Sequence, residues 1–302
     1  MAGFKSVGEY VDACEGGRNW ITQFRKAVPG VTNSAWVDMS VGTSGSYPPN
    51  YFASSPLVAA TLPSNKGISV QQTGGRSYIK DFTILSIAPS ATSIGADTVK
   101  YVLMDYVLYY PFIDLTSTEL QEFDNAVAIP RYTDGRGVRV MMVMQASNGN
   151  YAQSNLTMTY VNQDGVQRSI TSQLAYMSAT TSTIAVSAIS GSNNNTYFAP
   201  YLPLAAGDTG VRSITSVQLS ADWGGLACFV LVKPLLTGFV GQGCRRTTTG
   251  NLDSFGAPSQ MTNLIHSVNG AWIEDGAYIT PVLRFESNPG GGAICGTLET
   301  VW

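Results

Sequence analysis

Charge is what this sequence lacks most. Charged residues make up 12% of the 302 positions and the formal net charge is −3, about half the charged share of an ordinary globular domain. The basic residues are scattered, and nucleic-acid binding needs a concentrated basic surface, so we predict no nucleic-acid partner. Ser, Thr, Asn, Gln, Gly and Tyr take the place of the missing charge. Such a surface loses few charge–water contacts when it is buried against another protein, which favours a role in assembly or binding.

Histidine and paired cysteines are also scarce. The only histidine is His266, and the four cysteines Cys14, Cys228, Cys244 and Cys295 contain no CxxC pair. A metal site built from several histidines is therefore excluded, and the cysteine spacing favours free thiols over a zinc site or a disulfide framework. We predict no metal and no cofactor. Whether Cys14, Cys244 or Cys295 form disulfides between subunits stays open.

Long apolar segments are missing as well. The longest apolar runs, 101–113 and 226–236, are each interrupted by a charged residue and are too short to span a bilayer. The N-terminal residues lead into Glu9 and Asp12 instead of an apolar stretch, so no secretory signal is expected. We predict no membrane contact.

The first part of the chain has helical spacing. Ser6 and Glu9 fit a capping box ahead of apolar residues at helical intervals. A second short helix ending at Pro29-Gly30 would place Trp20, Ile21 and Phe24 on one face. We predict an N-terminal arm with short helices over residues 1–45. Its apolar groups either cover one end of the main domain or, as an interaction site of Trp20, Ile21 and Phe24, dock on a neighbouring subunit.

The remaining sequence is typical of strands. Residues 99–112 are apolar on both faces, as in a central strand that is covered on both sides. Residues 156–171 predict a hairpin whose loop is Gln163-Asp164-Gly165, with Gly165 in the left-handed conformation. Short strands separated by turns, without βαβ units, predict an all-β fold, β-sandwich or jelly-roll-like, with a short helical N-terminal segment. We assign 46–240 to the β-sandwich domain and 241–302 to a C-terminal β segment packing on the same domain.

Two acidic residues invite a catalytic interpretation. Asp208-Thr209-Gly210 matches the core of aspartic-protease sites, which need two carboxylates sharing a proton. The chain has a single such triplet and a Gly before the Asp, so a turn in which Asp208 caps local amides fits better. Asp105 lies among aromatics and is expected to pair with an Arg or to accept hydrogen bonds from Tyr hydroxyls or amides. His266 has no neighbouring triad partners. We predict that the protein is not an enzyme.

Tyrosines offer one further interpretation. Tyr109-Tyr110 and the Tyr47–Tyr51 segment would form a sugar-binding face if their rings were exposed. Aromatics at strand spacing are more often core residues. A carbohydrate-binding module therefore remains an alternative.

Five segments resemble a family of uncharacterised virion structural proteins of tailed bacteriophages. They are WVDMS (36–40), RYTDGRGVR (131–139), YVNQDG (160–165), FAPYLPLAAGDTGV (198–211) and VLVKPL (230–235). The resemblance implies a capsid-associated component (decoration, cement or vertex) located in the virion, assembled in the host cytoplasm and without a cofactor. It implies that the partners are other virion proteins and copies of the chain itself, with a trimer as the expected oligomer. Alternatives are a tail, baseplate or fibre-base adaptor, the carbohydrate-binding module and a dimeric hydrolase.

Overall fold

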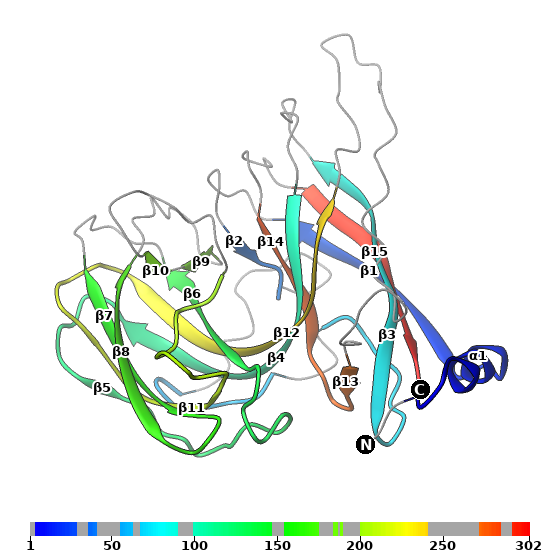
Figure 1. Cartoon of the computed structure of the whole chain (residues 1–302). Coiled ribbons are helices and arrows are strands. Elements are labelled where there is room, and N and C mark those ends of the chain that lie inside the picture. The colour runs from blue at the N-terminus through cyan, green and yellow to red at the C-terminus, as the bar shows by residue number, and fades with distance from the viewer. Residues whose placement is uncertain are drawn as a thin grey trace, which may run out of the picture.

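The computed structural model describes residues 4–28, 36–40, 55–62, 67–89, 99–146, 154–174, 184–186, 188–189, 200–240, 272–284 and 292–302. This part of the chain contains one helix, α1 (Val7–Glu15), and is otherwise built from strands. The all-β prediction with a short helical N-terminal segment is confirmed (Figure 1). The strands are β1 (Asn19–Val28), β2 (Trp36–Asp38), β3 (Arg76–Pro89), β4 (Val99–Asp114), β5 (Gln121–Glu122), β6 (Arg139–Ala146), β7 (Asn155–Asn162), β8 (Gln167–Leu174), β9 (Ile184–Val186), β10 (Ala188–Ile189), β11 (Val211–Leu219), β12 (Leu226–Val240), β13 (Trp272–Glu274), β14 (Ile279–Arg284) and β15 (Gly292–Val301).

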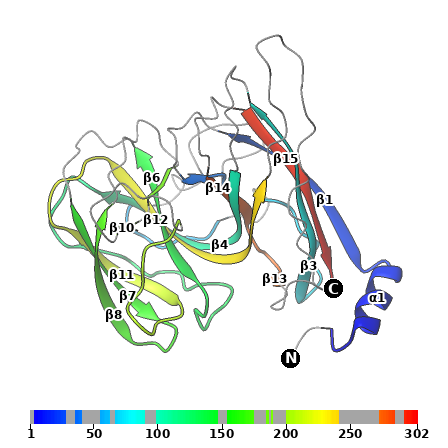
Figure 2. The same ribbon diagram turned by 45° about the horizontal axis from the view of Figure 1, so that its top comes forward.

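The strands form three sheets in sandwich-like layers. A closed barrel has the order β12-β4-β14-β2-β9-β6, a four-stranded sheet has the order β1-β15-β3-β13, and a five-stranded sheet has the order β10-β8-β7-β11-β5. The barrel lies in the middle, between the other two sheets (Figures 1 and 2). The named strands pair antiparallel throughout these sheets, for example Leu226 with Asp114 and Val240 with Val99 at the two ends of the β12–β4 ladder.

The doubly apolar pattern of β4 is explained by this arrangement. Alternate residues such as Met104 and Tyr106 join side chains of β2, β6, β12 and β14 in one buried cluster, which fills the barrel. The intervening residues, including Leu103 and Val107, belong to a second cluster that also contains residues of β1, β3, β7, β11 and β15. Strand β4 is therefore covered on both faces, as its sequence predicted.

The predicted second helix is wrong, because this segment is strand β1. It pairs with β15 from Asn19↔Val301 to Val28↔Gly292. Burial alternates along it, with Phe24 buried and both Gln23 and Arg25 exposed. The ladder to β15 joins the N-terminal segment to the other end of the chain, so β1 is not an arm that is separate from the β-structure. Pro29-Gly30, where this helix was predicted to end, lies outside the described residues.

Helix α1 begins as its sequence predicts. The Ser6 hydroxyl accepts a hydrogen bond from the Glu9 amide at 3.1 Å, and the Glu9 carboxylate accepts one from the Lys5 amide at 2.6 Å. The helix lies against the four-stranded sheet, where the Phe4 ring is 5.5 Å from the ring of Tyr78. Ala13 of α1 is fully buried.

The β7–β8 hairpin also follows the prediction. The Asn162 amide donates to the carbonyl of Val166, which closes a loop of Gln163, Asp164 and Gly165. Gly165 has φ +77°, and Met158 pairs with Ile170 on one face. At the C-terminal end of the chain, β14 belongs to the barrel and β15 to the four-stranded sheet. Both strands thus share sheets with earlier parts of the chain.

Candidate functional site

Exposed apolar side chains gather on the first two elements of the chain. Val7 is 70% exposed and Val11 is 42% exposed on α1, and Trp20 and Ile21 on β1 are 46% and 58% exposed. Among the described residues, strand β1 is an edge strand that pairs only with β15, and α1 lies at its N-terminal end (Figure 2). We call the exposed residues Val7, Val11, Trp20 and Ile21 the α1–β1 surface, in which Trp20 and Ile21 lie on opposite sides of the edge strand. An edge strand presents unpaired backbone groups, and together with exposed apolar side chains it is suited to contact another protein.

The three residues predicted as an interaction site do not share one face. Because β1 is a strand, Trp20 and Phe24 point to one side of the sheet and Ile21 to the other. Phe24 is a core residue whose ring stacks 5.6 Å from that of Phe82. Trp20 donates its indole N–H to Thr22, whose hydroxyl in turn donates to the Ser69 carbonyl. Trp20 and Ile21 remain accessible for contact, while Phe24 anchors the strand.

The sequence did not predict that Val7 and Val11 are exposed surface residues. They are four residues apart and so lie on one side of the helix, but the spacing alone does not say which side of α1 faces the sheet. The buried position of Ala13 shows that Val7 and Val11 lie on the solvent side.

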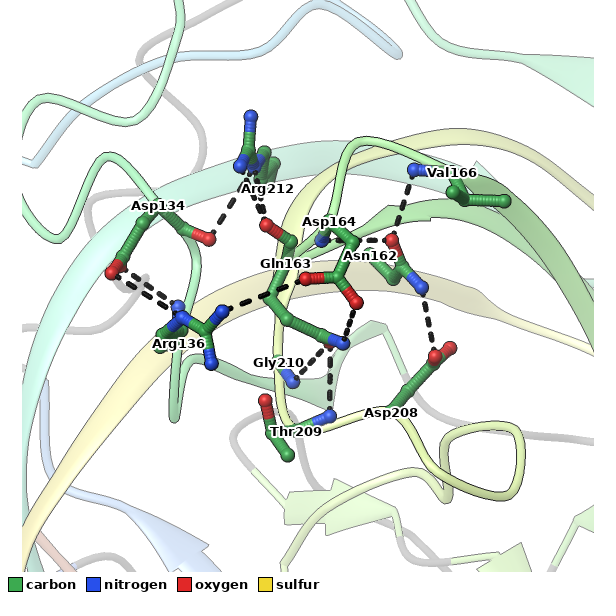
Figure 3. A network of polar contacts seen from close by, with 10 residues as sticks. All are labelled: Asp134, Arg136, Asn162, Gln163, Asp164, Val166, Asp208, Thr209, Gly210 and Arg212. Atoms are coloured by element: carbon green, nitrogen blue, oxygen red, sulfur yellow. Dashed lines mark hydrogen bonds and ion pairs between the residues drawn. The ribbon is translucent and has the colours of Figure 1, made fainter.

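The Asp-Thr-Gly segment lies at the β7–β8 turn, in a network of polar contacts (Figure 3). The Asp208 carboxylate accepts hydrogen bonds from the Tyr160 hydroxyl at 2.6 Å and from the Asn162 amide group at 2.8 Å. The side-chain oxygen of Gln163 accepts from the amides of Thr209 and Gly210 at 2.9 and 3.1 Å. The predicted turn is present, but Asp208 binds side chains of β7 and does not cap neighbouring amides.

These contacts give Asp208 a structural role. Its side chain is only 3% exposed, and its nearest cation is Arg168, at 3.9 Å. The hydrogen bond from Tyr160 lowers the pKa of Asp208 from its ordinary value. A proteolytic dyad instead raises the pKa of one carboxyl, because two carboxylates share a proton. Asp208 joins the 205–210 turn to the hairpin.

Asp105 forms a buried ion pair, as its sequence position suggested. The Arg131 guanidinium donates to both carboxylate oxygens, at 2.8 and 2.7 Å, and the Tyr278 amide adds a third hydrogen bond at 2.9 Å. Arg131 also donates to the carbonyls of Gly276 and Tyr106. The ion pair thus links β4 to the loop that begins at residue 131 and to residues 276–278, just before β14.

The polar residues near the end of the barrel have structural partners too. Asp38 accepts a hydrogen bond from Tyr106 at 2.6 Å and another from the Ser40 hydroxyl at 2.7 Å. Burial raises the pKa of Tyr106 well above its ordinary value. Tyr109 and Tyr110 are also buried, so they are core residues and not a sugar-binding face.

The structure describes some of the remaining candidate residues and not others. Cys228 is fully buried in the barrel, and Cys14 and Cys295 are partly buried and form no disulfide with a described cysteine. His266, Cys244 and the Tyr47–Tyr51 segment lie outside the described residues. Within the described ranges, no group of three or more His, Cys, Asp or Glu residues is placed to hold a metal ion. No helix in this part of the chain is long and apolar enough to cross a membrane.

Comparisons with known proteins give weak likenesses. No protein-family model and no curated protein matches the chain. A putative secreted protein from Parabacteroides distasonis matches at 10% identity and a TM-score of 0.23, over 80% of this chain and 92% of that one. The infectious bursal disease virus VP2 subviral particle matches at 10% identity and a TM-score of 0.18, over 94% of this chain and 81% of that one. A structure of the Gt strain of that virus matches at 9% identity with the same TM-score and coverage. TM-scores this low establish neither a common fold nor a common function.

Proposed function

We propose that the chain is a structural component of a tailed-bacteriophage virion, associated with the capsid as a decoration, cement or vertex protein, and that it is not an enzyme. The α1–β1 surface carries this proposal. It combines exposed apolar side chains with a strand edge that has no partner strand among the described residues, on a charge-poor protein. Such a surface can be buried against another subunit with little loss of charge hydration.

The layered β-fold agrees with this role. Its core is continuous from the barrel into both flanking sheets, and the acidic residues that suggested chemistry are held in structural contacts. A carboxylate that must accept and release protons needs a substrate-facing position, whereas Asp105 and Asp208 are both nearly inaccessible.

The experiment is co-sedimentation of the full-length chain with phage particles, together with sedimentation of the chain alone. Stable interfaces bury on the order of 1,200–2,000 Å², so a self-associating chain should sediment as an oligomer, with a trimer as our expectation. Trp20→Ser and Ile21→Ser should weaken self-association or particle binding. Both side chains are exposed, so the variants should stay folded.

Matched controls come from apolar side chains that are exposed elsewhere. Leu120 and Val166 are 55% and 47% exposed, on the side of the five-stranded sheet, and Leu120→Ser and Val166→Ser should leave sedimentation unchanged. A monomer that binds no particle would refute the structural role. Deletion of residues 1–35 is unsuitable, because it removes the β1 ladder and the core residue Phe24.

The position within the particle is a separate question. Binding to tails or baseplates but not to capsids would favour the tail-adaptor alternative over the capsid-associated one. Imaging reconstruction of purified particles, with the chain located in the density, distinguishes the two.

A further inference from the structure

A cavity of about 480 Å³ lies between the four-stranded sheet and the loop that follows Arg131. Its volume falls within the usual range for small-molecule sites. Three cations line it, Arg76, Arg136 and Lys233, together with the carboxylates of Asp134 and Glu274. The lining therefore has an excess of one positive charge and offers both hydrogen-bond donors and acceptors.

Arg76 is held in a fixed orientation at this cavity. It is the cross-strand partner of Glu274, with 3.6 Å between its guanidinium and the Glu274 carboxylate. Its guanidinium carbon lies 3.8 Å from the ring centroid of Trp272, two residues away on β13. Stacking on the indole leaves the guanidinium edge, with its N–H donors, available to a ligand.

Lys233 is held by neutral groups of the described residues. Its ammonium donates to the Arg136 carbonyl at 2.7 Å and lies 5.3 Å from the ring centroid of Tyr132, but among the described residues it forms no ion pair. Burial lowers its pKa. The Asp134 carboxylate acts on this ammonium only from beyond ion-pair distance, so the charge of Lys233 is incompletely compensated. Such a partly buried cation favours an anionic ligand, because the anion restores part of the solvation that burial removed.

The loop backbone is shaped around this ammonium. A Cβ atom at Gly137 would collide with the Lys233 ammonium, and Gly137 has φ +72°. Tyr132 has φ +53°, a strained conformation for a residue with a large side chain, and its ring packs 4.9 Å from that of Trp272. The loop thus brings Lys233 and the aromatic pair to one side of the cavity.

We propose that this cavity binds a sugar ring that carries a carboxylate. Lys233 and Arg76 bind the carboxylate, and Asp134 and Glu274 accept hydrogen bonds from the sugar hydroxyls. A simple anion would use only the cations, whereas an acidic sugar uses both kinds of group in the lining. This site is separate from the α1–β1 surface, and its test does not depend on particle binding.

The test is calorimetric titration of the full-length chain with glucuronate, with neutral glucose, and with inorganic sulfate. Glucuronate should bind more tightly than either of the others. Lys233→Met and Arg76→Gln should each weaken glucuronate binding about tenfold, the loss expected for one charge-assisted hydrogen bond. Lys5→Met and Arg25→Gln change exposed cations that do not line the cavity, and they should bind as the unmodified chain does.

Several results would overturn the assignment. They are the absence of saturable glucuronate binding, equal affinity for glucose or sulfate, and unchanged affinity in both cavity variants. If Lys233→Met fails to fold, Arg76→Gln decides, because Arg76 is partly exposed. The natural ligand could be a free sugar acid or part of a glycan chain, and titration with an oligosaccharide that contains glucuronate distinguishes the two. Tighter binding of the oligosaccharide than of glucuronate indicates a glycan chain. Equal binding indicates the free sugar acid. Either outcome supports the site.

Discussion

Replacing Arg131 by Met should destabilise the protein strongly. Asp105 is completely buried, and Arg131 supplies two of its hydrogen bonds and its compensating charge. With Met at this position, the carboxylate would keep the Tyr278 amide but lose its cation. Removing one partner of a buried ion pair costs about 3–5 kcal/mol of unfolding free energy, because an unpaired charge remains in the interior.

The double variant separates this effect from a simple loss of packing. Asp105→Asn combined with Arg131→Met removes both charges and keeps a side-chain oxygen for the Tyr278 amide. It should be more stable than Arg131→Met alone by about 1–3 kcal/mol. The exposed pair of Arg136 and Asp134, whose side chains are 64% and 59% exposed, provides the control. Arg136→Met should cost less than about 1 kcal/mol.

Urea denaturation at neutral pH measures five proteins: the unmodified chain, Arg131→Met, Asp105→Asn, the double variant and Arg136→Met. The reasoning would be refuted if Arg131→Met unfolded within about 1 kcal/mol of the unmodified chain, the range of exposed pairs. It would also be refuted if the double variant lost the sum of the two single losses, since additive effects mean that the two charges do not interact.

Gly165→Val should cost about 1–2 kcal/mol in urea denaturation, because φ is +77° at this position, and unchanged stability would contradict the left-handed turn. Asp208→Ala should cost about 1–3 kcal/mol, since the Tyr160 hydroxyl loses its acceptor, and peptide cleavage at acid pH that disappears in Asp208→Asn would contradict the structural role. Burial lowers the pKa of Lys26 to about 8 from 10.5. The unfolded chain therefore binds more protons between these values, and stability should rise as the pH increases from 8 to 10. Thermal melts across this range should show the rise in the unmodified chain and not in Lys26→Met. Chelator treatment should leave the melting temperature unchanged, and a large decrease would reveal a metal site.

Local sequence patterns were sufficient for much of the fold. The β7–β8 hairpin depends on neighbouring residues, and the left-handed preference of glycine at position 165 sets its loop. The cap of α1 is equally local, since Ser6 and Glu9 contact amides within the same turn. The apolar character of both faces of β4 predicted burial on both sides, and it also suggested that Asp105 must be paired.

The sequence alone could not distinguish a helix from a strand around Trp20, Ile21 and Phe24. Their spacing fits one side of a helix, and the same residues also fit an edge strand. The ladder to β15 decided the outcome, and that strand lies at the other end of the chain. The closure of the barrel could not be predicted from the sequence for the same reason. It depends on six strands that lie far apart in the chain and meet around one core: β2, β4, β6, β9, β12 and β14.

The sequence determined the strand-rich character, the turns, the low content of charged residues and the need to pair Asp105. Only the tertiary structure decided which residues stay exposed on α1 and β1, that Arg131 is the partner of Asp105, and that Arg76, Lys233 and Trp272 line one cavity. The physical reason is the distance along the chain over which each kind of interaction acts. Turn and strand preferences arise from a few neighbouring residues, whereas a site formed by distant segments depends on which strands pair, and strand pairing minimises the free energy of the whole chain.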